Sequence, residues 1–294
     1  MMKTRSCKPT SQWIPVAAFL VLSAGITLLG ILYHHFQAHH IQDDARQQLD
    51  AIADLKVDQI VRWRQERLAD ATVIQQNAIV VNSLCAYLAG DRSREKELKE
   101  WMASMRVNYD YLDVLLVDEA GQVLLAEGVT EPKTGASLRS LLLESMVGGH
   151  ILMSDFHQAD HVGLVHLDLV IPMTGLRRQG EAPGAGTCRI ALVMQIDPSR
   201  FLYPLIQLWP SPSASAETLL VRRDGDHVLF LNELRHQKGP ALSIRLPLDA
   251  SFLPAAMAVA GKTGFVEGMD YRHQPVLSAL RQIPGTPLVH GGEN

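Results

Sequence analysis

The stretch WIPVAAFLVLSAGITLLGILY, residues 13–33, contains no charged side chain. A helix of this length rises about 30 Å, which is enough to cross the hydrocarbon core of a bilayer. The rest of the chain must then fold on one side of a membrane. A cleaved signal peptide is the alternative, since secretion signals also combine a basic start with an apolar stretch. The length of this run, and the lack of a small-residue cleavage pattern after it, favour a retained anchor.

The charges around this run indicate its orientation. Lys3, Arg5 and Lys8 precede it without an acid, whereas the first charges after it are Asp43 and Asp44. Because basic flanks stay on the cytoplasmic side, residues 1–12 are predicted to be a cytoplasmic tail. We therefore expect a single-pass membrane protein whose N-terminus is cytoplasmic and whose remaining residues lie outside.

The composition of the 294 residues is that of a folded globular protein, with 47% hydrophobic and 20% charged residues. A net charge of -4 without a basic cluster gives no indication of nucleic-acid binding. Three cysteines, Cys7, Cys85 and Cys188, are too few for a disulfide scaffold. Cys85 and Cys188 would share an oxidising compartment, and whether they pair or remain buried thiols stays open.

A long helix is predicted over residues 41–88, and residues 41–106 form a helical connection. No Gly or Pro occurs between Ile41 and Gly90, and apolar residues recur at helical spacing. Lys56 and Arg67 fall on the apolar face, where we expect packed stems with charged heads at the edge rather than ligand contacts. The apolar positions are Leu49, Ile52, Ala53, Ile60, Trp63, Ala71 and Ile74.

Two α+β modules with antiparallel sheets are predicted after this helix. A helix at 93–105 precedes the first module, which covers residues 107–208. This module is predicted to contain a hairpin of two strands (111–118 and 122–127), a helix (137–146) and three further strands (150–156, 162–173 and 188–196). After a linker at 209–215, the second, residues 216–287, has hairpins at 218–223 and 227–232 and at 264–271 and 275–281, with a helix at 252–260 between them. Residues 288–294 read as an atypical C-terminal tail, too short to supply a closing strand, so an unpaired sheet edge is expected.

This pattern, an anchor, a long helix and two PAS-like modules, resembles the double Cache ectodomains of bacterial sensor histidine kinases and diguanylate cyclases. The resemblance implies an inner-membrane protein with a periplasmic sensor region, a small extracytoplasmic ligand and a homodimer through the long helix, with the stripe from Leu49 to Trp63 as its seam. It implies no cofactor in this region. The residues that carry it are Ala53-Asp54-Leu55-Lys56, Ile60, Trp63, Glu66, Arg67, Leu229-Phe230-Leu231-Asn232-Glu233-Leu234-Arg235, Gly268-Met269-Asp270-Tyr271-Arg272, Val276-Leu277-Ser278-Ala279 and Ile283-Pro284-Gly285-Thr286.

The chain departs from these relatives in two respects. In them, the Pro-Gly-Thr corner leads into a closing strand, a second transmembrane helix and an output domain, which we do not find after Thr286. The expected function is therefore that of a sensor without its transmitter, and the alternative is a non-signalling remnant or a periplasmic interaction module. The arginine, aromatic and aspartate set of the amino-acid-binding subgroup cannot be placed residue by residue, so that ligand is not carried over.

Polar residues of the first module are the candidates for ligand binding. Arg106 could pair with a carboxylate, the tyrosines could stack or donate hydrogen bonds, and aspartates could accept from an ammonium group. Asp168 alternates with His166 on one face of an apolar strand, where an unpaired charge is costly. Strand-edge residues meeting water are the alternative. The candidates are Arg106, Tyr109, Tyr111, Asp113, Asp155, His166 and Asp168.

Metal binding is a second interpretation of the same region, because nitrogen and oxygen donors gather there. Their spacing is loose, so a solvated loop is favoured and no metal site is predicted. A second histidine group, His34, His35, His39 and His40, is interpreted as interfacial. The donors of the first group are His157, Asp160, His161, His166 and Asp168.

Signatures of enzymes were tested and fail. Gly261-Lys262-Thr263 lacks the glycine that a phosphate-binding loop needs five positions earlier, where Ala256 stands. No Gly-x-Ser-x-Gly, His-Glu-x-x-His or paired-cysteine zinc pattern occurs in the sequence. A catalytic function is therefore not expected of this chain.

Overall fold

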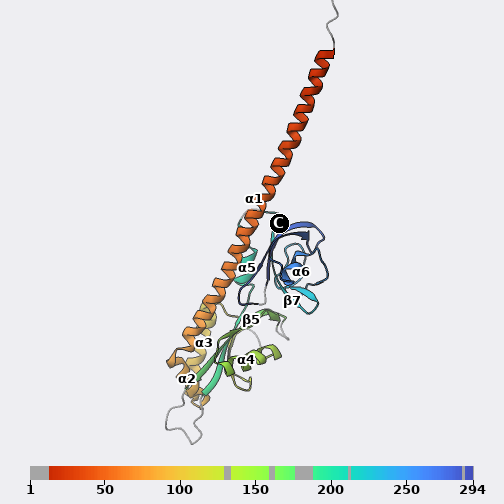
Figure 1. Cartoon of the computed structure of the whole chain (residues 1–294). Helices are drawn as coiled ribbons and strands as arrows, with labels where there is room; N and C mark the ends of the chain where they lie inside the picture. The colour runs from red at the N-terminus through yellow and green to blue at the C-terminus, as the bar shows by residue number, and fades with distance from the viewer. Residues whose placement is uncertain are drawn as a thin grey trace, which may run out of the picture. The chain divides into compact units, whose positions relative to one another are not determined.

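The computed structural model describes residues 13–128, 134–158, 163–175, 188–210, 213–286 and 289–293 (Figure 1). The chain divides into two compact units, Met1–Gln48 and Leu49–Asn294. Helix α1 (Trp13–Gln75) contributes residues to both. The Gly/Pro-rich residues 180–186, which the sequence predicts as a loop between the last two strands of the first module, lie outside the described residues.

The first unit is described from Trp13 onward and consists of the beginning of α1. Within the described part of the chain, α1 alone is both long and apolar enough to cross a membrane, and its most apolar window has a mean hydropathy of 2.3. Large apolar side chains such as Phe19, Val21 and Leu29 are exposed on it. So much exposed apolar surface suits lipid rather than water, which agrees with the predicted membrane-spanning segment.

The long helix does not continue to Leu88 as predicted. It ends at Gln75, and α2 (Ala78–Leu88) begins after Asn77, whose backbone is extended. The Asn77 side chain accepts hydrogen bonds from the backbone amides of Ile79 and Val80, so it caps the new helix. An asparagine at the N-cap can start a new helix even where no Gly or Pro ends the preceding one. With only Gly and Pro considered as helix ends, the sequence predicted one continuous helix.

The first module contains a six-stranded antiparallel sheet with the order β2-β1-β6-β5-β3, and β4 pairs with β5 beside that path. The predicted strand at 150–156 is shorter than expected: β3 covers only residues 152 and 153, and β4 begins at His157. Between them, the Asp155 side chain accepts a hydrogen bond from the backbone amide of Phe156, a local contact that competes with strand pairing. The elements are η1 (Arg92–Arg94), α3 (Glu95–Asn108), β1 (Asp113–Asp118), β2 (Val123–Gly128), α4 (Ala136–Gly148), β3 (Leu152–Met153), β4 (His157–Gln158), β5 (Val165–Gly175), β6 (Cys188–Ile196) and α5 (Leu202–Gln207).

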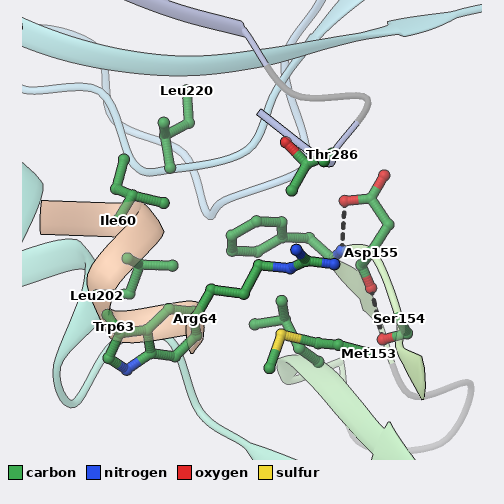
Figure 2. A pocket seen from close by; sticks show the side chains of 12 residues that line it. Ile60, Trp63, Arg64, Met153, Ser154, Asp155, Leu202, Leu220 and Thr286 are labelled. Atoms are coloured by element: carbon green, nitrogen blue, oxygen red, sulfur yellow. Dashed lines mark hydrogen bonds between the residues drawn. The ribbon is translucent and has the colours of Figure 1, made fainter. Parts of the chain in front are cut away.

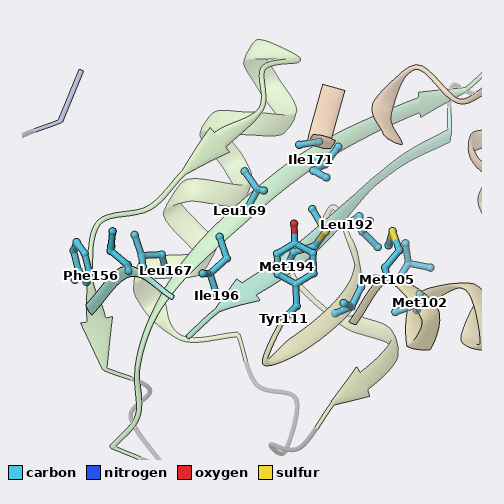
Figure 3. Packing of buried hydrophobic residues seen from close by; sticks show 14 of the residues in the cluster. Met102, Met105, Tyr111, Phe156, Leu167, Leu169, Ile171, Leu192, Met194 and Ile196 are labelled. Atoms are coloured by element: carbon cyan, nitrogen blue, oxygen red, sulfur yellow. The ribbon is translucent and has the colours of Figure 1, made fainter. Parts of the chain in front are cut away.

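Each face of this sheet packs against different helices. Leu169, Ile171 and Met194 belong to a core cluster with residues of α1, α2 and α3 (Figure 3). Leu115, Val170 and Val193 alternate with that set and pack against Leu138 and Leu142 of α4. Strands β1, β5 and β6 are therefore covered on both faces, which explains their long apolar runs.

The second module is a six-stranded antiparallel sheet with the order β10-β11-β12-β7-β8-β9. The prediction of no closing strand is wrong, because β12 lies between β11 and β7 and pairs with both. The short strand β9 and the helix α5 were not predicted. The elements are β7 (Glu217–Asp224), β8 (His227–Phe230), β9 (Arg245–Pro247), α6 (Pro254–Val259), β10 (Gly264–Met269), β11 (Pro275–Gln282) and β12 (Val289–Glu293).

The second part of α1 packs against the modules of its own chain. Leu49 and Ala53 contact Ala279 of β11, while Ile60 and Trp63 join the core of the first module. These residues are at most 8% exposed, so the stripe expected to be a dimer seam is already covered within one chain. The prediction of the seam is wrong, and dimerisation itself stays a prediction.

Lys56 also differs from expectation. Its side chain is 2% exposed, and its Nζ donates to the carbonyls of Leu205 and Leu208 at 2.6 and 2.7 Å. Burial lowers the pKa of Lys56. The ammonium group therefore caps the C-terminal end of α5, where helix carbonyls lack partners, instead of lying at the edge of the stripe.

A disulfide joins Cys85 of α2 to Cys188 of β6, with the two Cα atoms 5.6 Å apart. The pairing that the sequence left open is thus present. Gly175 lies opposite Cys188, and a Cβ there would stand 2.7 Å from Cys85 Sγ. The glycine leaves the space that the bond occupies.

Removing this disulfide is predicted to destabilise the protein. The bond spans 103 residues, so its loss frees a long loop in the unfolded chain. The double variant Cys85→Ala/Cys188→Ala should lose about 2–5 kcal/mol of unfolding free energy, measured by urea unfolding of the full chain in detergent micelles. Cys7→Ala is the control and should unfold like the parent protein. Equal stability of the double variant and the parent would contradict the prediction.

Candidate functional site

A row of polar side chains crosses the α4 face of the first sheet. Gln195 of β6 lies opposite Asp113 of β1 on one side and Asp168 of β5 on the other. All three are buried, at 8%, 1% and 0% exposure. They share the face of Leu115, Val193 and Val170 because side chains two residues apart along a strand point the same way. We refer to Asp113, Gln195 and Asp168 as the polar row.

Asp168 is contacted by side chains from two other parts of the first module. Gln195 Nε2 donates to Asp168 Oδ1 at 2.9 Å, and the backbone amide of Asp168 donates to Ser154 Oγ at 2.7 Å. These contacts fix the orientation of a carboxylate that would otherwise be costly to bury. Asp113 stands against Gly128, where a Cβ would come within 1.6 Å of Asp113 Oδ1. Gly128 therefore makes room for this carboxylate.

Two histidines lie at the Asp168 end of the polar row. His157 of β4 pairs with His166 of β5, and their ring centroids are 4.2 Å apart. His157 Nε2 is 3.1 Å from Asp168 Oδ2, and His166 Nε2 is 3.6 Å from Asp168 Oδ1. The sequence put His166 on a strand but His157 in a loop; the structure places both histidines on paired strands, and His166 is buried.

The pKa values of the two imidazoles are shifted in opposite directions. Burial alone would lower the pKa of His157, but the hydrogen bond and the charge of Asp168 outweigh it, so the pKa is raised. Burial lowers the pKa of His166 in spite of the same carboxylate. One carboxylate thus favours a charged neighbour on one side and tolerates a neutral one on the other.

The structure places Arg106, Tyr109 and Tyr111 apart from the polar row. Tyr111 belongs to the core cluster on the opposite face, which α1, α2 and α3 cover, and the centroid of its ring lies 6.0 Å from that of the stacked Tyr109 ring. The guanidinium of Arg67 lies 5.8 Å from the Tyr109 ring. Burial raises the pKa of Tyr111 to about 12. Among the described residues, Tyr111 Oη, Arg67 Nε and Arg106 Nε are buried without a hydrogen-bond partner.

Asp155 lies at a third place, the junction of the two modules. It forms an ion pair with Arg222 of β7, which also donates to the carbonyl of Phe156. Beside it is a small cavity of about 70 Å³. Figure 2 shows the Arg64 side chain extending from α1 into this cavity toward Asp155. Asp155 therefore joins the modules rather than the polar row.

The structure thus unites Asp113, His166 and Asp168 and adds Gln195, His157 and Ser154, which were not proposed as ligand residues. Gln195 interrupts the otherwise apolar run of β6, and this break was the available signal. Its pairing with Asp168 depends on strand register, which the sequence does not display. Asp160 and His161, the other donors of the weighed metal cluster, lie outside the described residues.

Comparisons with known proteins identify the fold. No family model and no curated protein matches the chain. The ligand-binding domain of the Campylobacter jejuni chemoreceptor Tlp3 in complex with 4-methylisoleucine matches 86% of this chain and 91% of its own, at 10% identity and a TM-score of 0.59. The extracellular domain of rpHK1S-Z16, named as a histidine kinase, matches 86% of this chain and 95% of its own, at 14% identity and a TM-score of 0.56. The ligand-binding domain of the Pseudomonas aeruginosa chemoreceptor PctB in complex with L-Arg matches 85% and 95%, at 13% identity and 0.53.

These likenesses define a class of fold. The chain has the α+β fold of Cache-type ligand-binding ectodomains of chemoreceptors and histidine kinases, as the sequence predicted. At identities this low, the likeness concerns the fold, and the function must be argued from the site.

The ion pair at the junction is predicted to couple the two modules energetically. In a double-mutant cycle of Asp155→Asn and Arg222→Met, we expect a coupling of about 1 kcal/mol, because both side chains are mostly buried, at 27% and 23% exposure. The measurement is urea unfolding of the full chain in detergent micelles. The pair Arg245–Asp224 is the control, since it is more exposed and lies within one module. Equal coupling in the two pairs would contradict the prediction.

Proposed function

We propose that this chain is a membrane-anchored extracytoplasmic sensor domain that binds a small molecule at the polar row of its first module. The single observation that carries this proposal is the row itself: two carboxylates and an amide are buried side by side on a sheet of the Cache fold. A folded protein retains such costly groups where they bind something. The fold adds support, because similar domains were solved with amino acids bound.

The chemistry of the row favours a ligand that donates hydrogen bonds. Carboxylate oxygens only accept when ionised, and the amide of Gln195 is already turned toward Asp168. A protonated amine, as in an amino acid or a polyamine, fits these acceptors and offsets their charge. Tyr111, which we expected to stack or donate a hydrogen bond, lies on the other face, and Arg106, which we expected to pair with a carboxylate, lies on α3, so neither belongs to this site.

We infer that binding is passed on through α1. Residues of this helix contact both modules, and Lys56 and Trp63 belong to the contacts that fix it. An orientation with the N-terminus in the cytoplasm, indicated by Lys3, Arg5 and Lys8, places both modules in the periplasm. The output pathway, of the two-component or cyclic-dinucleotide type, follows only from the resemblance. The alternative of a non-signalling remnant was argued from an unpaired edge in the second sheet. Strand β12 pairs with both β11 and β7, so this argument no longer applies.

Thermal unfolding of the full chain in detergent micelles tests the proposal. We expect one class among amines, amino acids, organic acids and purines to raise Tm, with amines or amino acids favoured. A ligand at a hundred times its Kd stabilises the folded state by about 2.7 kcal/mol, which is easily measured.

Asp113→Asn should remove most of this stabilisation, because it replaces a buried charged acceptor. Asp249→Asn, at an exposed carboxylate of the second module, is the matched control and should respond like the parent protein. If no compound changes Tm, or if both variants respond equally, the proposed site is wrong.

A further inference from the structure

We propose that His157, His166 and Asp168 together bind one divalent transition-metal ion of the zinc type. This inference goes beyond the proposed function, because it concerns the end of the polar row and does not require that a small molecule binds. The sequence favoured solvated donors, but the structure brings these residues together on the paired strands β4 and β5, with His166 and Asp168 buried and His157 partly exposed.

The ligand atoms already converge. One atom from each residue lies within 4.8 Å of the others. His157 Nε2 and Asp168 Oδ2 are 3.1 Å apart, and His166 Nε2 and Asp168 Oδ1 are 3.6 Å apart. Two ligand atoms bound to the same tetrahedral zinc ion are separated by about 3.3 Å, as follows from bonds of about 2.0–2.1 Å. The two distances end on different oxygens of the carboxylate, Oδ2 and Oδ1, and bracket this value, so an ion bound through this carboxylate lies within reach of both histidines once the side chains adjust.

The hydrogen bonds of the other ring nitrogens decide the tautomers. His157 Nδ1 is 3.0 Å from the carbonyl of Asp155, and His166 Nδ1 is 3.2 Å from the carbonyl of Leu164. A carbonyl can only accept, so each Nδ1 must carry a hydrogen and donate it. In the neutral imidazoles, the lone pair of each Nε2 then faces the carboxylate of Asp168. Three acceptors that face one another in a buried place require a cation between them.

The surroundings of the carboxylate resemble the outer contacts of resident metal sites. Such sites hold each ligating histidine through its second nitrogen and each carboxylate through a further hydrogen bond. Here the two carbonyls hold the histidines, and Gln195 Nε2 holds Asp168 Oδ1 at 2.9 Å. The cluster thus has ligands and supporting contacts in place without any residue from outside the first module.

The donor set selects the class of ion. Two imidazole nitrogens and one carboxylate oxygen suit zinc and its neighbours in the transition series, whereas magnesium and calcium require mostly oxygen ligands. Three protein ligands leave at least one position of a tetrahedral ion open to water or to a small molecule. A proton held between His157 and Asp168 is the competing explanation for the same geometry.

Metal binding to the full chain in detergent micelles separates the two explanations. The protein is stripped with a chelator and dialysed against Zn²⁺, and bound zinc per chain is measured; absorption of bound Co²⁺ in a parallel sample reports nitrogen and oxygen coordination. Relative to the parent protein, His157→Gln and Asp168→Asn should each bind one ion fewer per chain, or bind it at least 10-fold more weakly. Loss of an outer contact alone weakens metal binding by about 10–100-fold, and loss of a ligand should weaken it at least as much.

His227→Gln is the matched control, because His227 is exposed on β8 of the second module. It should bind as many ions as the parent, including any held by histidines near the anchor. If Asp168→Asn does not fold, His157→Gln decides the question, since its ring is 22% exposed and its replacement leaves the core intact. Equal zinc content and equal Co²⁺ spectra in the parent and His157→Gln would overturn the proposal. The amine and amino-acid melts, run with a chelator present, report on the proposed function separately.

Discussion

The pairing of β5 with β6 determines both the core and the candidate site of the first module. One register runs from Leu167 opposite Ile196 to Gly175 opposite Cys188. At one end it places Gly175 where the disulfide needs space, and at the other it sets Asp168 beside Gln195. A slip by one residue would turn Asp168, together with His166 on the same strand, to the face covered by α1, α2 and α3 and remove Asp168 from Gln195. The apolar middle of the two strands therefore holds the polar end in position.

The second part of α1 acts as the common support of the two modules. Lys56 holds the end of α5, while Asp50 and Asp54 on the same helix pair with Arg281 of β11. Isolated surface ion pairs contribute little, but these contacts accompany buried apolar packing by Leu49, Ala53 and Ile60. A change in the first module can thus bias the second through one rigid element, and such a coupling still needs direct measurement before it is called a pathway.

The sequence was sufficient for elements with a clear period and insufficient for features that depend on pairing. Strand β6 was predicted with its observed bounds, because an apolar run between turn signals is a local property. Helix α5 and strand β9 are too short to show a period. The end of α1 depended on a single capping asparagine, and β12 contains two glycines that argue against a strand until its neighbours are known. For the candidate site, the sequence identified Asp113, His166 and Asp168. It did not show that the other candidates lie elsewhere, Tyr111 on the opposite face of the sheet and Asp155 at the junction of the modules.

His157, His166 and Asp168 show why residue type alone did not predict the cluster that they form. In a loop, such side chains keep their water and need no partner, which is the common case. On a covered strand, the same groups lose water, and the folded state must replace it with hydrogen bonds or with a cation. The carboxylate of Asp168 receives only part of that replacement, from Gln195 Nε2. Whatever cation completes it, whether proton, ammonium group or metal ion, stabilises the first module as it binds, so the occupancy of this site and the stability of the sheet that carries it rise and fall together.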